Sequence, residues 1–274
     1  MAITTRDELI AALAAAERQG IYKASLAAEG AGTSASLWKV AGRPAAGANP
    51  PLFSSGSGYI PTRATTGAIG QTNGGADPLC LLRAAMAGTT VGTLIVYDRL
   101  WACSGFGTVI TTEQTIATPG TLTAGRAPNG GADVEPWLEV YTAPGATGAT
   151  WTVKGTDSAG NTARTWTYAH PANAESVGQM MPLLPGGASP ASTRGCDAPT
   201  SFQASATSGT AGDIGVTLIR RLVEIPLMLA NVGVVLDAIA TALVEVPDDA
   251  CLAMMVQCTT TNTGVLQGRV DFGG

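Results

Sequence analysis

The sequence predicts a mainly β protein with a β-sandwich or jelly-roll-like body, one short N-terminal helix and an extended arm. Turn residues recur about every ten positions along the last two thirds of the chain. The runs between them are rich in β-branched and aromatic residues, and one segment near the start has helix signals. We expect a helix-and-arm region over residues 1–75 and a β-sandwich body over residues 76–274. A division of that body into two β subdomains near residue 130 is the alternative.

The predicted helix begins behind Thr5, whose hydroxyl and the carboxylate of Glu8 match a capping box. Gly20 provides the stop signal. Apolar residues follow at helical spacing, namely Leu9, Ile10, Leu13 and Ala16. A helix this short is marginal in water by itself, so its apolar stripe must dock on a protein surface. That surface belongs either to the same chain or to a neighbouring subunit.

Segment 29–75 is dominated by Gly, Ala, Ser, Pro and Thr, with Trp38 inside it. This composition favours an extended arm or long loops over packed elements. Long segments without regular structure are uncommon in compact domains and are usually functional, so we expect the arm to lie along a partner. Trp38 and three helix residues, Leu9, Ile10 and Leu13, are therefore the candidate contacts of an assembly interface.

Strands are predicted throughout the remainder of the chain. Segments 150–154 and 162–168 form a hairpin around the turn residues 157–160, and Trp151 and Trp166 are placed to pair across it. The other predicted strands are 92–98, 107–112, 137–141, 180–184, 201–205, 214–219, 251–256 and 265–271.

Low charge indicates which partners the protein has. Charged residues make up 13% of the chain, about half the usual share. We expect a surface covered by Thr, Ser, Gly and partner protein, with a neutral soluble monomer as the alternative. The net charge is −5 and the Lys and Arg residues do not cluster, so the electrostatic footprint of nucleic-acid binding is missing.

The cysteines are expected to be reduced and buried, because their number is odd and they form no C-x-x-C motif. The single histidine cannot complete a zinc set with them, so neither a metal nor a cofactor is predicted. The cysteines are Cys80, Cys103, Cys196, Cys251 and Cys258.

No membrane association is predicted. The most apolar stretch, 225–236, contains Pro226 and is too short to span a bilayer. The first ten residues show no basic region followed by an apolar core, so no signal peptide is expected. The overlapping segment 232–246 fits either a short helix or a strand.

The inventory of reactive side chains is thin, and no enzymatic activity is predicted. The one histidine, His170, follows a predicted strand and precedes a proline, which is typical of a surface loop. Ser36 and Lys39 match an S-x-x-K string, but its companion motifs are missing. Glu135 and Glu139 could act as a carboxylate pair, although twenty acidic residues produce such pairs by chance.

Tryptophan offers two further possibilities. In a β sandwich, exposed tryptophans can form a sugar-stacking platform, but more often they are core or interface anchors. We favour the second role here. The five tryptophans are Trp38, Trp101, Trp137, Trp151 and Trp166.

Several strings occur in an order that resembles a family of tailed-bacteriophage virion proteins. They are TTRDELI at 4–10, KASLA at 23–27, SLWKVAGRP at 36–44, GTLIVYDRL at 92–100, GTVITT at 107–112, WLEVYT at 137–142 and SGTAGDIGVT at 208–217. The resemblance covers nearly the whole chain. It implies a structural component of the particle, with no catalytic residues to carry over.

Within that family we expect a cement or decoration protein on the head, located in the virion. Its partners would be the major capsid protein and further copies of itself, as a homotrimer by analogy with closed rings at three-fold positions. The alternatives are a tail or host-recognition protein that binds carbohydrate, a hydrolase with two converging carboxylates, and a ring-forming tail-tube or adaptor subunit.

Overall fold

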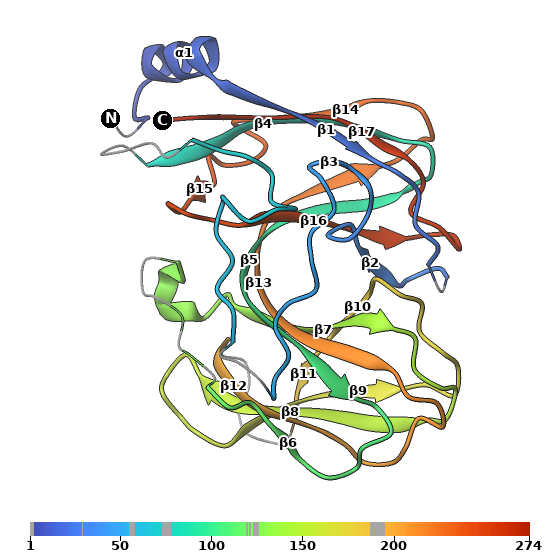
Figure 1. Cartoon of the computed structure of the whole chain (residues 1–274). Coiled ribbons are helices and arrows are strands. Elements are labelled where there is room, and N and C mark those ends of the chain that lie inside the picture. Colours follow the sequence, from blue (N-terminus) through green and yellow to red (C-terminus); the bar gives the residue numbers. More distant parts are fainter. Residues whose placement is uncertain are drawn as a thin grey trace. The chain divides into compact units, whose positions relative to one another are not determined.

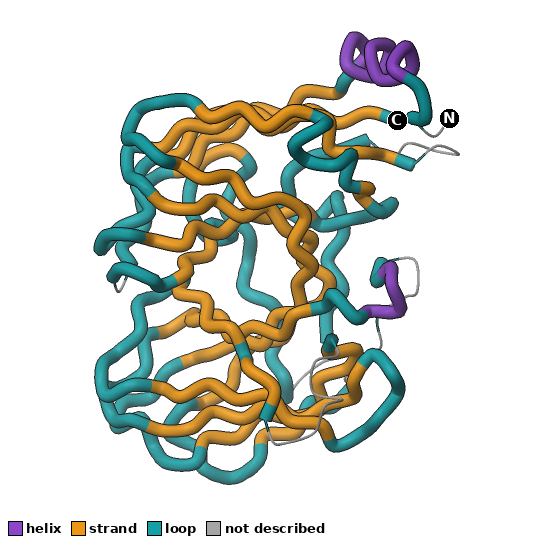
Figure 2. The backbone as a smooth tube through the Cα atoms, turned by 180° about the vertical axis from the view of Figure 1, so that it is seen from behind, coloured by secondary structure: helices purple, strands orange, loops and turns teal. Residues whose placement is uncertain are grey.

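The computed structural model describes residues 3–28, 30–54, 58–72, 78–118, 120, 122, 126–186 and 195–274. The chain is mainly β, as predicted, and its described residues form one α-helix, a short 3-10 turn and several sheets (Figures 1 and 2). The helical elements are α1 (Arg6–Ala15) and η1 (Pro128–Gly131). The strands are β1 (Glu17–Lys23), β2 (Ser34–Ser36), β3 (Gly42–Arg43), β4 (Leu79–Gly88), β5 (Gly92–Gly107), β6 (Gln114–Thr115), β7 (Glu135–Thr142), β8 (Ala149–Asp157), β9 (Arg164–His170), β10 (Gln179–Pro182), β11 (Leu184–Pro185), β12 (Cys196–Ala204), β13 (Asp213–Leu227), β14 (Val234–Asp237), β15 (Glu245–Val246), β16 (Leu252–Cys258) and β17 (Leu266–Gly273).

The chain forms two compact units, each assembled from segments that are far apart in the sequence. Unit 1 comprises Met1–Ala48, Thr62–Asp98 and Arg221–Gly274, and unit 2 comprises Asn49–Pro61 and Arg99–Arg220. These bounds differ from the expected divisions at residues 75 and 130. The long strands β5 and β13 each contribute residues to both units, so no single cut in the sequence separates them.

Unit 1 is a β-sandwich-like body with an aliphatic core. One sheet has the strand order β14-β4-β17-β1-β3, with β15 also paired to β4. β16 pairs with β2 and with the first half of β5. Side chains from both groups of strands form one buried cluster, as expected when two sheets pack face to face. It includes Leu81, Met86, Leu94, Val96, Met254, Val270 and Phe272.

Unit 2 is a second β-sandwich-like body, and its core is aromatic. One sheet has the strand order β11-β9-β8-β12-β6, and β7 pairs with both β10 and β13. The buried cluster includes Trp101, Phe106, Leu138, Trp151, Trp166, Phe202 and Val216.

The predicted helix start is confirmed, but the predicted end is wrong. Thr5 caps α1 with a complete capping box, and hydrogen bonds from the backbone of Thr4 and Thr5 lower the pKa of Glu8 to about 2. The helix ends at Ala15, and Gly20 lies within β1 opposite Arg269 of β17. A ladder of seven residue pairs with β17 therefore overrides the local helix signals.

Several strand predictions need correction. Segment 107–112 is a turn that follows β5, except for Gly107, the last residue of that strand. Segment 232–246 contains β14 and β15 joined by turns, so the strand alternative holds. β4 was not predicted, because Leu and Ala favour helices by propensity. Its pairing with β17 on one side and with β14 and β15 on the other makes it a strand.

The predicted hairpin is present, but with a different cross-strand pairing. β8 and β9 are antiparallel, and Trp151 lies opposite Tyr168 while Val153 lies opposite Trp166. The expected pair of Trp151 with Trp166 is therefore wrong. Asp157 shapes the turn, because its Oδ1 accepts hydrogen bonds from the backbone of Ala159 and Asn161, each 2.9 Å long.

The predicted arm lies against its own chain in both units. In unit 2, the backbone of Phe53 donates to the Ser104 carbonyl, and the Phe53 ring stacks on Phe106 at 4.8 Å. In unit 1, the backbone of Ile69 donates to the Leu252 carbonyl and its side chain is buried. The described residues of this segment are largely irregular, as predicted, but they are an integral part of the two units.

Candidate interaction surface

The four predicted contact residues do not form one exposed surface. Leu9 and Leu13 pack with the buried residues Ala12, Cys80 and Leu82, so α1 docks on its own body. Ile10, by contrast, is 55% exposed.

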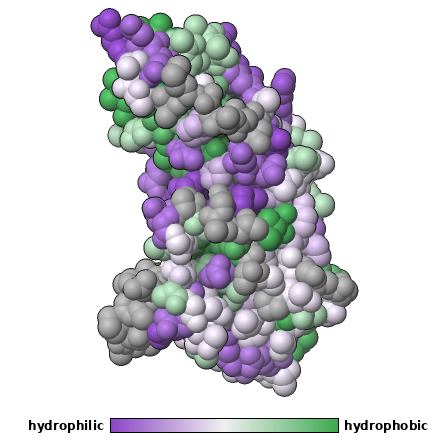
Figure 3. All heavy atoms as spheres, turned by 90° about the vertical axis from the view of Figure 1, so that its left-hand side faces the viewer, coloured by the Kyte–Doolittle hydropathy of each residue, from purple (hydrophilic) through white to green (hydrophobic). Residues whose placement is uncertain are grey.

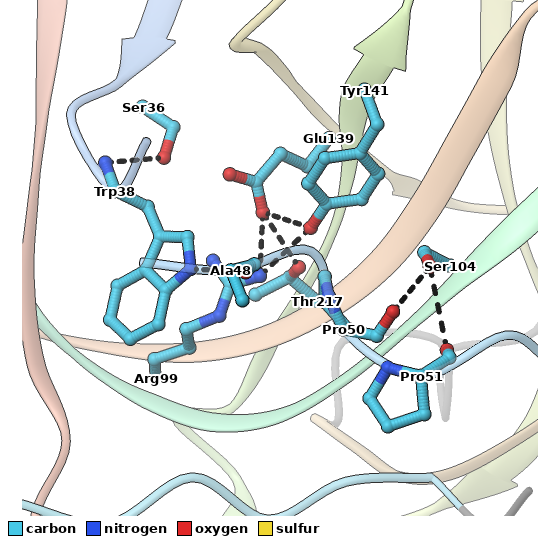
Figure 4. A network of polar contacts seen from close by, with 10 residues as sticks. All are labelled: Ser36, Trp38, Ala48, Pro50, Pro51, Arg99, Ser104, Glu139, Tyr141 and Thr217. Atoms are coloured by element: carbon cyan, nitrogen blue, oxygen red, sulfur yellow. Dashed lines mark hydrogen bonds and ion pairs between the residues drawn. The ribbon is translucent and has the colours of Figure 1, made fainter. Parts of the chain in front are cut away.

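Trp38 requires a correction, because it is 3% exposed and packs inside unit 1. Its Nε1 donates to the Ala48 carbonyl at 2.9 Å (Figure 4). A Cβ added at Gly47 would lie 2.2 Å from the Trp38 ring, so the chain wraps tightly around the indole. Trp38 is a core anchor and not an exposed contact.

All five tryptophans are buried, so the predicted core role is confirmed. A sugar-stacking platform made of tryptophan is not available on this surface. Figure 3 shows one face of the molecule, where near-neutral residues make up much of the area beside hydrophilic ones and small hydrophobic patches.

Exposed apolar side chains concentrate on one segment of unit 1. Met228 is 72% exposed, Val235 is 62% exposed and Ile239 is 82% exposed. Leu229 and Val232 are also exposed. We call these five residues the 228–239 surface. Exposed apolar groups gathered in this way are typical of interaction sites.

Strand β14 holds part of this surface outward by simple alternation. It pairs antiparallel with β4, with Val235 opposite Ala85. Val234 and Leu236 pack on the core of unit 1, and Val235 points to the other side of the sheet. β14 is the last strand in the order of its sheet. Edge strands in proteins are usually protected by charges or prolines, and β14 carries only Asp237 at its end.

The turn after β14 fixes Ile239 in its exposed position. Asp237 Oδ1 accepts hydrogen bonds from the backbone of Ile239 at 3.1 Å and of Ala240 at 3.0 Å. The Thr241 hydroxyl donates to the Leu81 carbonyl at 3.1 Å, and Ala238 is buried. Both ends of the turn are thereby anchored, which leaves Ile239 to face solvent.

A groove of about 410 Å³ adjoins the 228–239 surface. Its walls come from the end of β13, the start of β5 and the end of β16, including Leu227, Gly92 and Cys258. Met228 lines the groove and also belongs to the 228–239 surface. None of the lining residues is charged. The groove and the 228–239 surface therefore meet at Met228, and Asp237 is the one charged residue within the segment that carries the surface.

Unit 2 buries a charged pair inside its core (Figure 4). Arg99 Nη2 lies 2.7 Å from Glu139 Oε2, and both side chains are 1% exposed. The Tyr141 and Thr217 hydroxyls donate to the same Glu139 oxygen at 2.7 Å and 3.2 Å. Burial, and then the negative charge of Glu139, raise the pKa of Tyr141 well above its usual value. Glu139 is thus part of a buried ion pair, not an exposed partner for Glu135.

His170 is also buried, which corrects the prediction of a surface-loop histidine. Ser36 lies in β2 and its hydroxyl accepts a hydrogen bond from the backbone of Trp38, so Ser36 is not on the helix turn that an S-x-x-K site requires.

The prediction of free, buried cysteines is confirmed for all five. Burial raises the pKa of Cys103 to about 12 and that of Cys258 to about 11, so neither is a reactive thiolate at neutral pH. Within the described ranges, no group of three or more His, Cys, Asp and Glu residues could hold a metal ion. In the same part of the chain, no helix is long and apolar enough to cross a membrane.

The sequence also carries a pattern that indicates the 228–239 surface. The chain from 225 to 244 carries one charge, Asp237, and its apolar residues fall on both faces of β14. A strand with one buried face is expected to alternate. Apolar residues on the second face therefore indicate a second packing partner.

Comparisons with known proteins give no family for the chain. No family model matches it, and no curated protein matches it. A chain from the structure of the infectious bursal disease virus Gt strain is similar over 71% of this chain and 40% of its own length, with 15% identity and a TM-score of 0.16. A likeness at this TM-score carries no argument about fold or function.

Proposed function

We propose that the chain is a structural protein of a tailed-bacteriophage particle, a cement or decoration protein that stabilises the head. The observation that supports an assembly role is the 228–239 surface, which adjoins an uncharged groove. Apolar surface of this kind costs free energy in water, and burial against a partner removes that cost. The family resemblance of the sequence suggests the kind of assembly.

In this role the protein bridges neighbouring subunits of the major capsid protein and so resists the outward pressure of packaged DNA. Two sandwich-like units with buried aliphatic and aromatic cores suit a protein that must resist mechanical stress, because close-packed interiors have low compressibility. A homotrimer at three-fold positions is the proposed arrangement, because closed rings satisfy every copy of the interface.

Electron microscopy of particles with and without this protein tests the location. We expect additional density on the outside of the head in particles that contain it. Density on the tail, or equal images of both particles, would contradict the proposal.

Binding to purified heads tests the surface itself. We expect Val235→Lys combined with Ile239→Lys to weaken head binding by at least about tenfold, because each introduces a charge that must be desolvated at the contact. The melting temperature should change little, since both side chains are exposed. Leu184→Lys, at an exposed apolar residue of unit 2, is the matched control and should bind normally. Unimpaired head binding by the double variant would refute the role of the 228–239 surface.

A further inference from the structure

In unit 1, the sheet with the strand order β14-β4-β17-β1-β3 has two edges that differ in charge. One edge is formed by β14 and β15, which both pair with β4. At the other edge lies β3, which pairs with β1. Edge strands present backbone groups and side chains that a neighbouring chain can contact, so the charges at each edge indicate which neighbour fits.

A row of four charged residues crosses this sheet in register. It consists of Arg18 in β1, Asp271 in β17, Arg83 in β4 and Asp237 in β14. Residues directly opposite each other on paired strands share a face of the sheet. In the middle of the row, Arg83 Nη1 lies 3.8 Å from Asp271 Oδ2, and Arg269 Nε lies 3.4 Å from Asp271 Oδ1. The two ends of the row, Arg18 and Asp237, are exposed and have opposite charge.

The edge formed by β1 and β3 carries a second exposed arginine. Arg43 in β3 lies opposite Tyr22 in β1. Tyr22 is four positions from Arg18 along the strand, so Arg43 and Arg18 lie on the same face. Glu17 lies on the other face, where its carboxylate accepts the Thr72 backbone N–H at 2.6 Å. We call Arg18 and Arg43 the positive edge.

The edge formed by β14 and β15 carries only acidic charge. Asp237 ends β14, Glu245 begins β15, and both residues are exposed. The sequence from 222 to 268 contains no Lys or Arg. We call Asp237 and Glu245 the negative edge. Within the described residues, Arg18, Arg43 and Asp237 form no ion pair, so their charges are available to a neighbouring chain.

We propose that copies of this chain associate head to tail, with the positive edge of one copy against the negative edge of the next. A second copy is the occupant whose charges match, because both signs come from opposite edges of one sheet. Pro44 follows β3 and has no N–H, so paired charges rather than a long backbone ladder carry the contact. Val235, which is 62% exposed and shares a face with Asp237, is covered in such a contact.

A head-to-tail contact forms a closed ring when its rotation allows closure. The number of copies in the ring rests on the proposed function, in which three copies form a homotrimer. The edges themselves do not depend on that role, so the association is tested in solution without heads.

Sedimentation equilibrium of the full chain tests the proposal. We expect reversible association that weakens at high salt, because the paired charges are exposed. Arg18→Glu combined with Arg43→Glu places like charges at the contact and should weaken association by at least about tenfold. The matched control is Arg6→Glu combined with Arg221→Glu, which changes the net charge equally at two partly or fully exposed side chains outside this sheet. It should associate like the unmodified chain.

A mixture of two variants tests the head-to-tail arrangement. Asp237→Asn keeps a side-chain oxygen for the backbone N–H groups of Ile239 and Ala240 but removes the charge, so it should also weaken association. Mixed with the Arg18→Glu, Arg43→Glu variant, it should form a dimer, because each variant supplies one intact edge. Dimer formation also shows that both variants are folded.

A chain that stays monomeric at every concentration would overturn the proposal. Equal association of the Arg18→Glu, Arg43→Glu variant and its control would overturn it as well. Association in solution without any binding to heads would support these edges and contradict the proposed function alone.

Discussion

Unit 1 and unit 2 are both β-sandwich-like, yet they differ in the composition of their cores and in where exposed apolar side chains gather. Unit 2 contains four of the five tryptophans and buries polar networks around Glu139 and His170 within its core. Unit 1 has an aliphatic core and exposes the 228–239 surface. The difference indicates that buried polar contacts help to specify the core of unit 2, whereas unit 1 carries the 228–239 surface, which we propose is covered by a partner.

The largest effect is expected from a variant that disrupts the polar core of unit 2. Arg99→Met removes the partner of a carboxylate that is 1% exposed. We expect a loss of roughly 3–5 kcal/mol in the free energy of unfolding, because a buried charge is left uncompensated.

Urea denaturation measures this loss. Arg221→Met is the control, since its pair with Glu224 is solvent-exposed and should contribute less than about 1 kcal/mol. Similar losses in the two variants would show that the core of unit 2 does not depend on its buried ion pair.

An intermediate effect on the free energy of unfolding is expected from the buried lysine of unit 1. Lys23 is 1% exposed and its Nζ donates to the carbonyls of Val40 at 3.0 Å and Pro44 at 2.8 Å. Burial lowers its pKa from 10.5 to about 8. Between these two pH values the unfolded chain binds more protons than the folded chain, so the free energy of unfolding rises with pH.

That rise should reach at most about 3 kcal/mol, from the size of the pKa difference. Comparing the pH dependence of unfolding for the unmodified chain and for Lys23→Met isolates the contribution of Lys23, because all other titratable groups are the same in both proteins. Parallel curves from pH 8 to pH 10.5 would mean that the Lys23 amine reaches solvent in the folded state.

The smallest expected effect concerns the helix that only unit 1 carries among the described residues. Thr5→Ala removes the hydroxyl that accepts the Glu8 backbone hydrogen bond at 3.2 Å. We expect a loss of about 1 kcal/mol, typical of a helix N-cap.

Thermal unfolding measures the Thr5→Ala effect, and hydrogen exchange shows whether it is confined to α1. Thr4→Ala is a suitable comparison, because the Thr4 hydroxyl donates only to the exposed Glu8 carboxylate, at 3.0 Å, and accepts no backbone N–H of the helix. An equal loss in Thr4→Ala would argue against a special role of the capping hydroxyl of Thr5.

Local sequence patterns were sufficient to predict those elements that depend on hydrogen bonds between residues a few positions apart. The capping box of α1 and the hairpin turn at Asp157 were predictable because their hydrogen bonds span three or four positions. The buried cysteines followed from their spacing and their apolar neighbours. The cross-strand partner of Trp151 was not predictable, because one change of register moves each side chain to a new neighbour.

Contacts between segments that are distant in the sequence decided the elements and the burial that the sequence did not predict. Glu17–Lys23 became β1 through β17, and Leu79–Gly88 became β4 through three partner strands. His170 was expected on a surface loop, but Gly145 and Glu175 enclose it. Trp38 was expected on a partner, but the chain from Gly47 folds back over it.

By itself, the sequence determined the β class, the low surface charge, the cap of the first helix and the free state of the thiols, because these depend on composition and on neighbouring residues. Only the tertiary structure decided which residues are exposed, how the two units divide the chain and which charges are buried together. Burial and pairing depend on segments that the sequence separates by tens or hundreds of residues, and their proximity arises only when the sheets pack.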